Sequence, residues 1–368
     1  MKRIYKGIGI LLLIFVVAIA SLGAVIYIHP YIRFQQDLAE QRERVAALKE
    51  NPAAPIDEQS FVDFDLSLAK DIKYNEIQTL ITHNSYKKNM WKFGYNLLSV
   101  FADVEGFHYE HDKLSEQFNH GVRGVELDIR YRKGRFIIYH VDTIDTGSHC
   151  PDWLLTLEEM KIWSDNNPGH IPISVLVEVK EDALSAEMLQ ELDDSVRNVM
   201  GNDKLITPSL LMGDNKTLRN VAARNDWVSL REALGKFMFI LHPHDDAVQR
   251  YISLDPTMRT QALVPMFAYK DYAKGNPAFT DYFLLIKYDK LVVDTVQPLI
   301  NSGFMVRVRM DGPDNYKEGN QSLAVSTGAQ IISTDFEPGV VYPVVDYQAT
   351  LRDEKMVTLS KNLIHYPN

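Results

Sequence analysis

The chain carries a succession of short apolar segments of strand length, separated by segments with helical patterns. The longest, IPISVLVEVK, is apolar almost throughout, as strands buried on both faces are. Apolar strands that alternate with helices predict a parallel sheet. Polar residues follow several of them, and in a (β/α)₈ barrel the functional site lies at that end of the strands. The sequence therefore predicts an α/β fold of the (β/α)₈, TIM-barrel type. The expected strands are 77–82, 125–130, 135–140, 171–180, 237–242, 304–311 and 329–336.

Two of these segments carry polar residues that indicate a metal-assisted phosphodiesterase site. The run IQTLITHNSY ends its apolar part at His83 and Asn84. The run GVRGVELDIR places Glu126, Asp128 and Arg130 on one face, because side chains alternate along a strand. A His-Asn pair after one strand and an acid-x-acid pair on a later strand supply both proton-transfer groups and metal ligands.

The composition disfavours a nucleic-acid partner and a general attraction to membranes, and it excludes disulfides within the chain. The 368 residues are 46% hydrophobic and 24% charged, which is typical of a globular chain. The formal net charge of −10 disfavours a nucleic-acid partner, which would select a basic surface. It also gives no general attraction to an anionic membrane, so any membrane attachment must be local. With Cys150 as its single cysteine, the chain has no internal disulfide and no thiolate metal cluster.

The N-terminus predicts a membrane anchor over residues 1–30. Lys2, Arg3 and Lys6 precede the uncharged run 7–28, which has about the ~20 residues needed to cross a bilayer. The basic flank predicts a cytoplasmic N-terminus and an extracytoplasmic catalytic domain. The alternative is a cleaved signal peptide with an A-x-A site at 18–20, which would make the protein secreted. The apolar run continues past Ala20 and therefore favours the anchor.

A helical stalk and a proline-containing linker are expected over 31–60. Leu38, Val45 and Leu48 form a thin apolar stripe at helical spacing, and the NPAAP sequence after Glu50 ends the helix. We expect this helix to be solvated; a short coiled-coil contact in a dimer is the alternative, and the oligomeric state stays open. The main domain is expected over 61–345, followed by a polar tail over 346–368.

An aromatic-rich segment, 86–109, follows the first strand and is long for a connection between a strand and a helix. Leu97, Leu98 and Phe101 fit one helical turn, which predicts packing in the core. The functional alternative is a rim at the mouth of the site that touches lipid.

Four motifs together resemble the phosphatidylinositol-specific phospholipase C superfamily, and most of all its calcium-dependent branch. They are ITHNSY, GVRGVELDIR, IIYH and VLVEVK. The YEHDKLSEQFNHGVRG lead-in, NNPGHIPI, RVRMD and STDF extend the similarity over residues 76–336. The resemblance implies the barrel fold of these phosphodiesterases and a membrane phospholipid as substrate.

The resemblance also implies the roles of individual residues. His83 and His140 correspond to the catalytic pair. The implied calcium ligands are Asn84, Glu126, Asp128 and Glu178. Carboxylate and amide oxygens are hard ligands that suit Ca²⁺; Mg²⁺ is the alternative, and the acid content favours Ca²⁺. In the family the inositol 2-hydroxyl attacks the phosphate, which releases diacylglycerol and a cyclic inositol phosphate. We assign His83 as the base or as a hydrogen-bond donor to the transition state, and His140 as the acid.

One departure concerns the second motif. The metal-independent branch carries Asp-x-Arg there, with the arginine in place of the metal, and this chain has both Glu126-Leu-Asp128 and Asp128-Ile-Arg130. The acid at 178 and the amide at 84 favour the metal. The expected substrate-binding residues are Arg130, Lys180, Arg307 and Arg309, with structural ion pairs as the alternative for each.

Two further functions are alternatives. Glycerophosphodiester phosphodiesterases share an acid-x-acid pair and two histidines, but they carry His-Arg-Gly where this chain has His83-Asn84-Ser85. A catalytically inactive lipid-binding barrel would be expected to lack a histidine or a ligand, and here the whole set is present. His111, His149 and His170 are expected to be structural. The lipid head group cannot be read from spacing.

Overall fold

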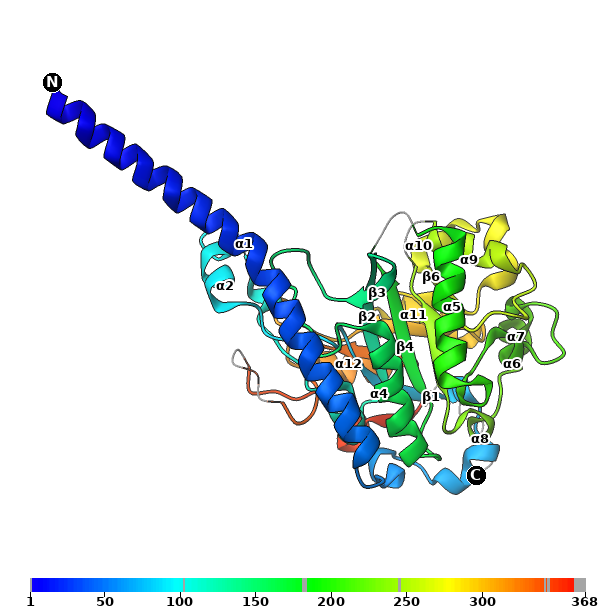
Figure 1. The fold of residues 1–368 in the computed structure, drawn as a ribbon. Coiled ribbons are helices and arrows are strands. Elements are labelled where there is room, and N and C mark those ends of the chain that lie inside the picture. The colour runs from blue at the N-terminus through cyan, green and yellow to red at the C-terminus, as the bar shows by residue number, and fades with distance from the viewer. Residues whose placement is uncertain are drawn as a thin grey trace.

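The computed structural model describes residues 2–101, 103–180, 184–243, 246–340, 342 and 345–360; within these, the side chains of 2–15, 18–22, 24, 25 and 97 are outside the description. Its centre is a ring of parallel strands, surrounded by helices, and one long helix leans on this body and projects beyond it (Figure 1).

Eight parallel strands line the barrel in the order β1-β9-β8-β7-β6-β5-β4-β2. Their bounds are β1 (Ile77–Thr82), β2 (Gly124–Arg132), β4 (Ile173–Val179), β5 (Phe237–Leu241), β6 (Val264–Ala268), β7 (Leu285–Lys287), β8 (Met305–Arg309) and β9 (Ile331–Thr334). Two antiparallel strands flank them: β3 (Arg135–Ile138) beside β2, and β10 (Val357–Leu359) beside β1. The predicted α/β fold is confirmed, and β10 extends the sheet into the segment expected to be a polar tail.

Strands β1 and β2 meet where the ring closes. The Arg123 amide donates to the Leu80 carbonyl (3.0 Å), and the Ser85 amide donates to the Glu126 carbonyl (3.0 Å). Gly124 lies at this junction, where a Cβ would come 2.2 Å from Ile81 Cγ2. The missing side chain therefore allows the two strands to approach, and this approach brings the ends of β1 and β2 together.

Helices cover the outside of the ring (Figure 1). Three of them are α3 (Leu114–Asn119), α4 (Trp153–Asn166) and α5 (Ala186–Met200). The aromatic-rich segment contains α2 (Lys92–Leu98). The others are α6 (Pro208–Met212), α7 (Leu218–Arg224), α8 (Leu230–Ala233), α9 (Ala247–Leu254), α10 (Tyr269–Lys274), α11 (Val293–Asn301) and α12 (Asn320–Thr327).

The first helix, α1 (Lys2–Glu50), is continuous through Pro30 and ends at the predicted NPAAP sequence. Its second half is not the solvated stalk that the sequence predicted, because Leu38 and Val45 are buried against the domain. Gln41 is fully buried and exchanges hydrogen bonds with Thr156 and the backbone of Asp152. Buried polar groups need such partners, so these bonds fix α1 against the start of α4.

An ion pair adds to this contact. Arg44 Nη2 lies 2.9 Å from Glu159 Oε2, and Glu159 is fully buried. Among the residues that the structure describes, no helix is long and apolar enough to cross a membrane. Most side chains of the predicted span, 7–28, fall outside that description.

We expect Gly124→Ala to destabilise the domain, because the added methyl group would separate β1 from β2 at the junction. Overpacking of this kind costs about 1–3 kcal/mol, measurable as a lower free energy of unfolding in urea. Gly169→Ala is the matched control, since a Cβ there meets nothing within 4 Å. Equal stability of the two variants would show that the close approach of β1 and β2 does not depend on the glycine.

Candidate active site

His83 follows directly after β1 and is anchored by a buried acid. Its Nδ1 lies 2.7 Å from Oδ1 of Asp335, which follows β9. Arg309 Nη2 lies 2.7 Å from the other Asp335 oxygen. Burial opposes ionisation of Asp335, but His83 and Arg309 hold the pKa of this carboxyl below its usual value. A carboxylate on Nδ1 orients the ring and leaves Nε2 for proton transfer.

His140 follows β3 and has an equivalent arrangement. Its Nδ1 lies 2.8 Å from Oδ2 of the buried Asp145, and Lys87 Nζ lies 2.9 Å from the same carboxylate oxygen. Burial lowers the pKa of His140, and it would raise that of Asp145, but His140 and Lys87 outweigh it and the Asp145 pKa is lowered. Each predicted catalytic histidine is thus hydrogen-bonded to a buried aspartate that also pairs with a cation.

The surroundings of Asn84 connect the two histidines. Asn84 adopts a left-handed conformation (φ 49°) directly after His83, and its Nδ2 donates to the Tyr109 hydroxyl (2.8 Å). The Lys87 ammonium lies 5.0 Å from the centre of the Tyr109 ring. Buried groups therefore run without interruption from one histidine–aspartate pair to the other.

Three carboxylates gather on the neighbouring strands. Glu126 and Asp128 lie on β2 and Glu178 lies on β4, where Asp128 and Glu178 are register partners. Glu126 Oε1 is 3.8 Å from His83 Nε2. Neither oxygen of the fully buried Asp128 has a hydrogen-bond partner of normal geometry among the described residues. Burial raises the Asp128 pKa to about 8, with Glu178 and Glu126 adding to the effect and Lys180 opposing it.

Two cations touch this cluster. Lys180 Nζ lies 2.5 Å from Glu178 Oε1 and 3.2 Å from Asp128 Oδ2. Arg307 Nη2 lies 3.0 Å from Glu126 Oε2, and Arg307 also pairs with Asp289. Burial opposes ionisation of Glu126, but His83 and Arg307 hold the pKa of this carboxyl well below its usual value.

The cluster suits a divalent cation. One ligand atom each from Glu126, Glu178 and His242 lie within 4.8 Å of one another. Asp128, the register partner of Glu178, has no hydrogen bond of normal geometry among the described residues and would add hard oxygens of the kind that Ca²⁺ prefers. Oxygen donors dominate the set, and the Asn84 amide comes from the adjacent strand end. The donors present therefore fit Ca²⁺.

His242 is the functional candidate that the sequence analysis missed. It ends the apolar run of β5 and is buried, and neither ring nitrogen has a hydrogen-bond partner among the described residues. Burial lowers the His242 pKa to about 3, so the ring is neutral, and Nδ1 lies 3.4 Å from Glu178 Oε2. Its signal was its position directly after a buried strand, the same signal that marked His83.

The four expected substrate-binding residues divide into two groups. Lys180 contacts the carboxylate cluster and Arg309 pairs with Asp335, the partner of His83; each keeps about a quarter of its side chain exposed. Arg307 is buried behind Glu126. Arg130 donates to the His140 carbonyl (2.7 Å) and lies over the Tyr139 ring, 4.7 Å from its centre. Arg130 is therefore engaged with the segment that carries His140.

Comparison with known proteins identifies the relatives of this arrangement. The family model for Ca²⁺-dependent phosphoinositide phospholipase C matches residues 72–135 and 130–360. No curated protein matches the sequence. A calcium-dependent phosphoinositol-specific phospholipase C from Pseudomonas sp. is 15% identical, with a TM-score of 0.60 over 82% of this chain and 99% of that one. Its myo-inositol complex gives the same values.

A second solved structure has the same fold. It is a Ca²⁺-dependent phosphatidylinositol-specific phospholipase C from Streptomyces antibioticus, 17% identical, with a TM-score of 0.54 over 72% of this chain and 95% of that one. At these identities the two structures establish a shared fold.

We expect Asp128→Asn to weaken Ca²⁺ binding by at least about tenfold, because ligand charge sets the affinity of oxygen sites. Isothermal titration with CaCl₂ measures this directly, without substrate. Asp165→Asn on α4 is the matched control, since Asp165 pairs with lysines away from the site. Unchanged Ca²⁺ affinity in Asp128→Asn would place the cation elsewhere.

Proposed function

Because the chain belongs to the Ca²⁺-dependent phosphoinositide phospholipase C family, we propose that it cleaves phosphatidylinositol-like lipids into diacylglycerol and a cyclic inositol phosphate. Membership makes the protein a phosphodiesterase with Ca²⁺ as its cofactor. The observation that carries the finer proposal is the pair of histidines, each bound through Nδ1 to a buried aspartate. The myo-inositol bound by the Pseudomonas enzyme supports inositol as the head group. We further propose that the catalytic domain works outside the cytoplasm, where calcium is more available.

The proposed reaction uses the two histidines in turn. His83 Nε2 accepts the proton of the inositol 2-hydroxyl while the oxygen of that hydroxyl forms a bond to phosphorus. The bond between phosphorus and the glycerol oxygen breaks, and His140 donates a proton to that oxygen, which leaves as diacylglycerol. Burial lowers the pKa of His140, and Asp145 opposes this effect by stabilising the protonated ring and keeping it in place.

The metal site would be formed by Asn84, Glu126, Asp128 and Glu178, with His242 beside it. A bound Ca²⁺ supplies positive charge for the phosphate oxygens and lowers the pKa of the attacking hydroxyl. Within the chain, Arg307 favours the ionised form of Glu126, and Lys180 favours the ionised form of Glu178.

We propose that Lys180 and Arg309 bind the phosphate or the inositol hydroxyls. Both are partly exposed, Lys180 at the carboxylate cluster and Arg309 at the aspartate that holds His83. Arg307 is assigned to holding Glu126 in place. Arg130 is assigned to holding the backbone of His140, through its hydrogen bond to that carbonyl. These two arginines then act on the substrate through other residues.

The test is turnover of phosphatidylinositol and of glycerophosphoinositol by the full chain, each with Ca²⁺, with Mg²⁺ and with chelator. We expect Ca²⁺-dependent release of cyclic inositol phosphate, reduced about 10²–10⁴-fold in His83→Ala and in His140→Ala, since each loses a proton-transfer group. His120→Ala is the matched control at a partly exposed histidine.

Other outcomes would identify the alternatives. Hydrolysis of glycerophosphodiesters without a cyclic product would indicate glycerophosphodiester phosphodiesterase activity. No turnover of either substrate, with Ca²⁺ still bound, would indicate a lipid-binding barrel without catalysis.

A further inference from the structure

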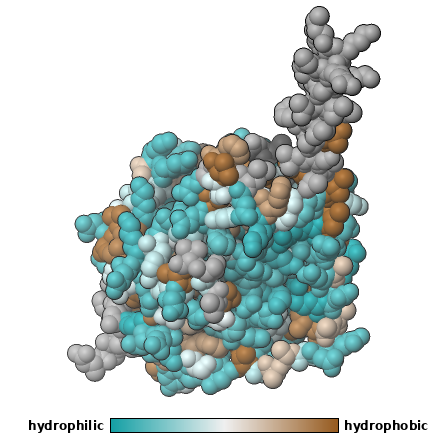
Figure 2. Space-filling view, turned by 90° about the vertical axis from the view of Figure 1, so that its left-hand side faces the viewer, coloured by the Kyte–Doolittle hydropathy of each residue, from teal (hydrophilic) through white to brown (hydrophobic). Residues whose placement is uncertain are grey.

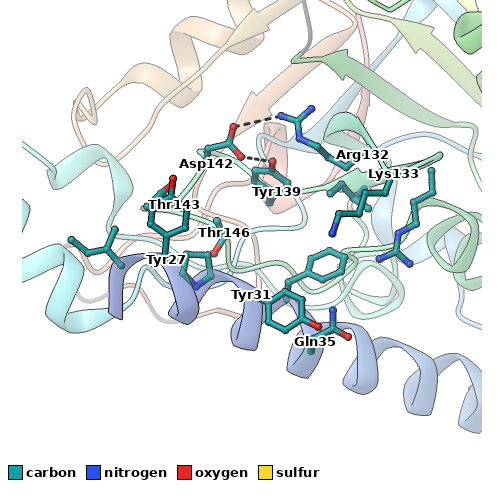
Figure 3. Close-up of a pocket in the computed structure, with 14 residues that line it drawn as sticks. Tyr27, Tyr31, Gln35, Arg132, Lys133, Tyr139, Asp142, Thr143 and Thr146 are labelled. Carbon is teal, nitrogen blue, oxygen red and sulfur yellow. Dashed lines mark hydrogen bonds and ion pairs between the residues drawn. The ribbon is translucent and has the colours of Figure 1, made fainter. Parts of the chain in front are cut away.

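A groove lies between α1 and the hairpin of β2 and β3, and its lining includes Tyr139 and Asp142, which lie on either side of His140 in the sequence (Figure 3). Its volume is about 460 Å³. Pro30 and Phe34 of α1 form one wall, and Ile137 and Tyr139 form the other. This apolar trough is formed by contact between α1 and the catalytic domain, and the site described above does not use it.

Three cations line one side of the trough. Arg132, Lys133 and Arg135 cluster at the hairpin turn, and the Arg135 guanidinium lies 5.5 Å from the centre of the Phe34 ring. The acid that faces them from the groove lining is Asp142, 3.6 Å from Arg132. In a chain with a net charge of −10, this local excess of positive charge fits an anionic ligand with an apolar portion.

The groove adjoins exposed apolar side chains of α1. Tyr27 is 86% exposed, Tyr31 65% and Ile28 54%. Figure 2 shows hydrophobic residues along the described part of this helix, above a face that is largely hydrophilic. Apolar surface of this kind beside a basic rim is typical of contact with lipid rather than with a soluble anion.

We propose that this groove binds an anionic membrane phospholipid. Its acyl chain lies between α1 and the hairpin, and its phosphate pairs with Lys133 and Arg135. Tyr139, Asp142 and Thr146 line the same groove, and the segment that contains them also supplies His140 and Asp145. A bound lipid would therefore stabilise the segment that carries His140. The groove is proposed independently of the phospholipase C activity.

The experiment uses the full chain in phosphatidylcholine vesicles that contain a photoactivatable phosphatidylglycerol with a diazirine in its acyl chain. After illumination, labelled peptides are mapped by mass spectrometry. We expect labelling of residues 26–35 and 132–139. Lys133→Glu/Arg135→Glu should reduce this labelling at least about tenfold, since basic residues provide the attraction to anionic lipid.

The matched control is Lys270→Glu/Lys274→Glu on α10, which changes the charge equally on another part of the domain (Figure 1). Excess glycerol phosphate should leave the labelling unchanged, and a phosphatidylcholine probe should label the groove weakly. Equal labelling in both double variants, or equal labelling by the phosphatidylcholine probe, would overturn the proposal. Loss of labelling with glycerol phosphate would reassign the groove to soluble phosphates.

Discussion

The site depends on the burial of carboxylates where water is excluded. Taking an ionised carboxylate out of water costs several kcal/mol unless a partner compensates. Asp335 and Asp145 each have a histidine and a cation, and Glu126 has Arg307. Asp128 has Lys180 at 3.2 Å and no hydrogen bond of normal geometry among the described residues. The cluster therefore carries more negative charge than its protein partners compensate, and a divalent cation would supply the missing positive charge.

The compensating groups also determine the geometry of catalysis. The ion pairs that stabilise Asp335 and Asp145 fix the two imidazoles that those aspartates hold. The same contacts therefore compensate the buried charges and orient the two histidines proposed to transfer protons. The close packing of β1 against β2 at Gly124 brings Glu126 to within 3.8 Å of His83.

The sequence predicted the parts of the site that lie in continuous motifs. His83, Glu126 and Asp128 could be placed because they lie in or directly after two recognisable strands, and the family resemblance added Glu178. Their partners come from distant loops and strand ends, and only the topology brings them together: Asp335, Asp145, Lys87 and His242. Strands β7 and β10 were missed because they have only three residues each, and β6 was missed because it contains a proline. The packing of α1 was missed because its polar contacts, through Gln41 and Arg44, have the composition of a solvated helix.

The position of β3 at the end of the sheet has a consequence for the evolution of this fold. His140 and Asp145 follow β3, which pairs with β2 at the edge of the sheet and is not one of the eight parallel strands of the barrel. His140, the proton donor proposed for the leaving group, is thus carried by a hairpin outside the barrel, whereas His83 directly follows a barrel strand. A change confined to this hairpin would leave the eight parallel strands intact and remove the proposed proton donor. A small change in sequence would thus turn such an enzyme into a binding protein.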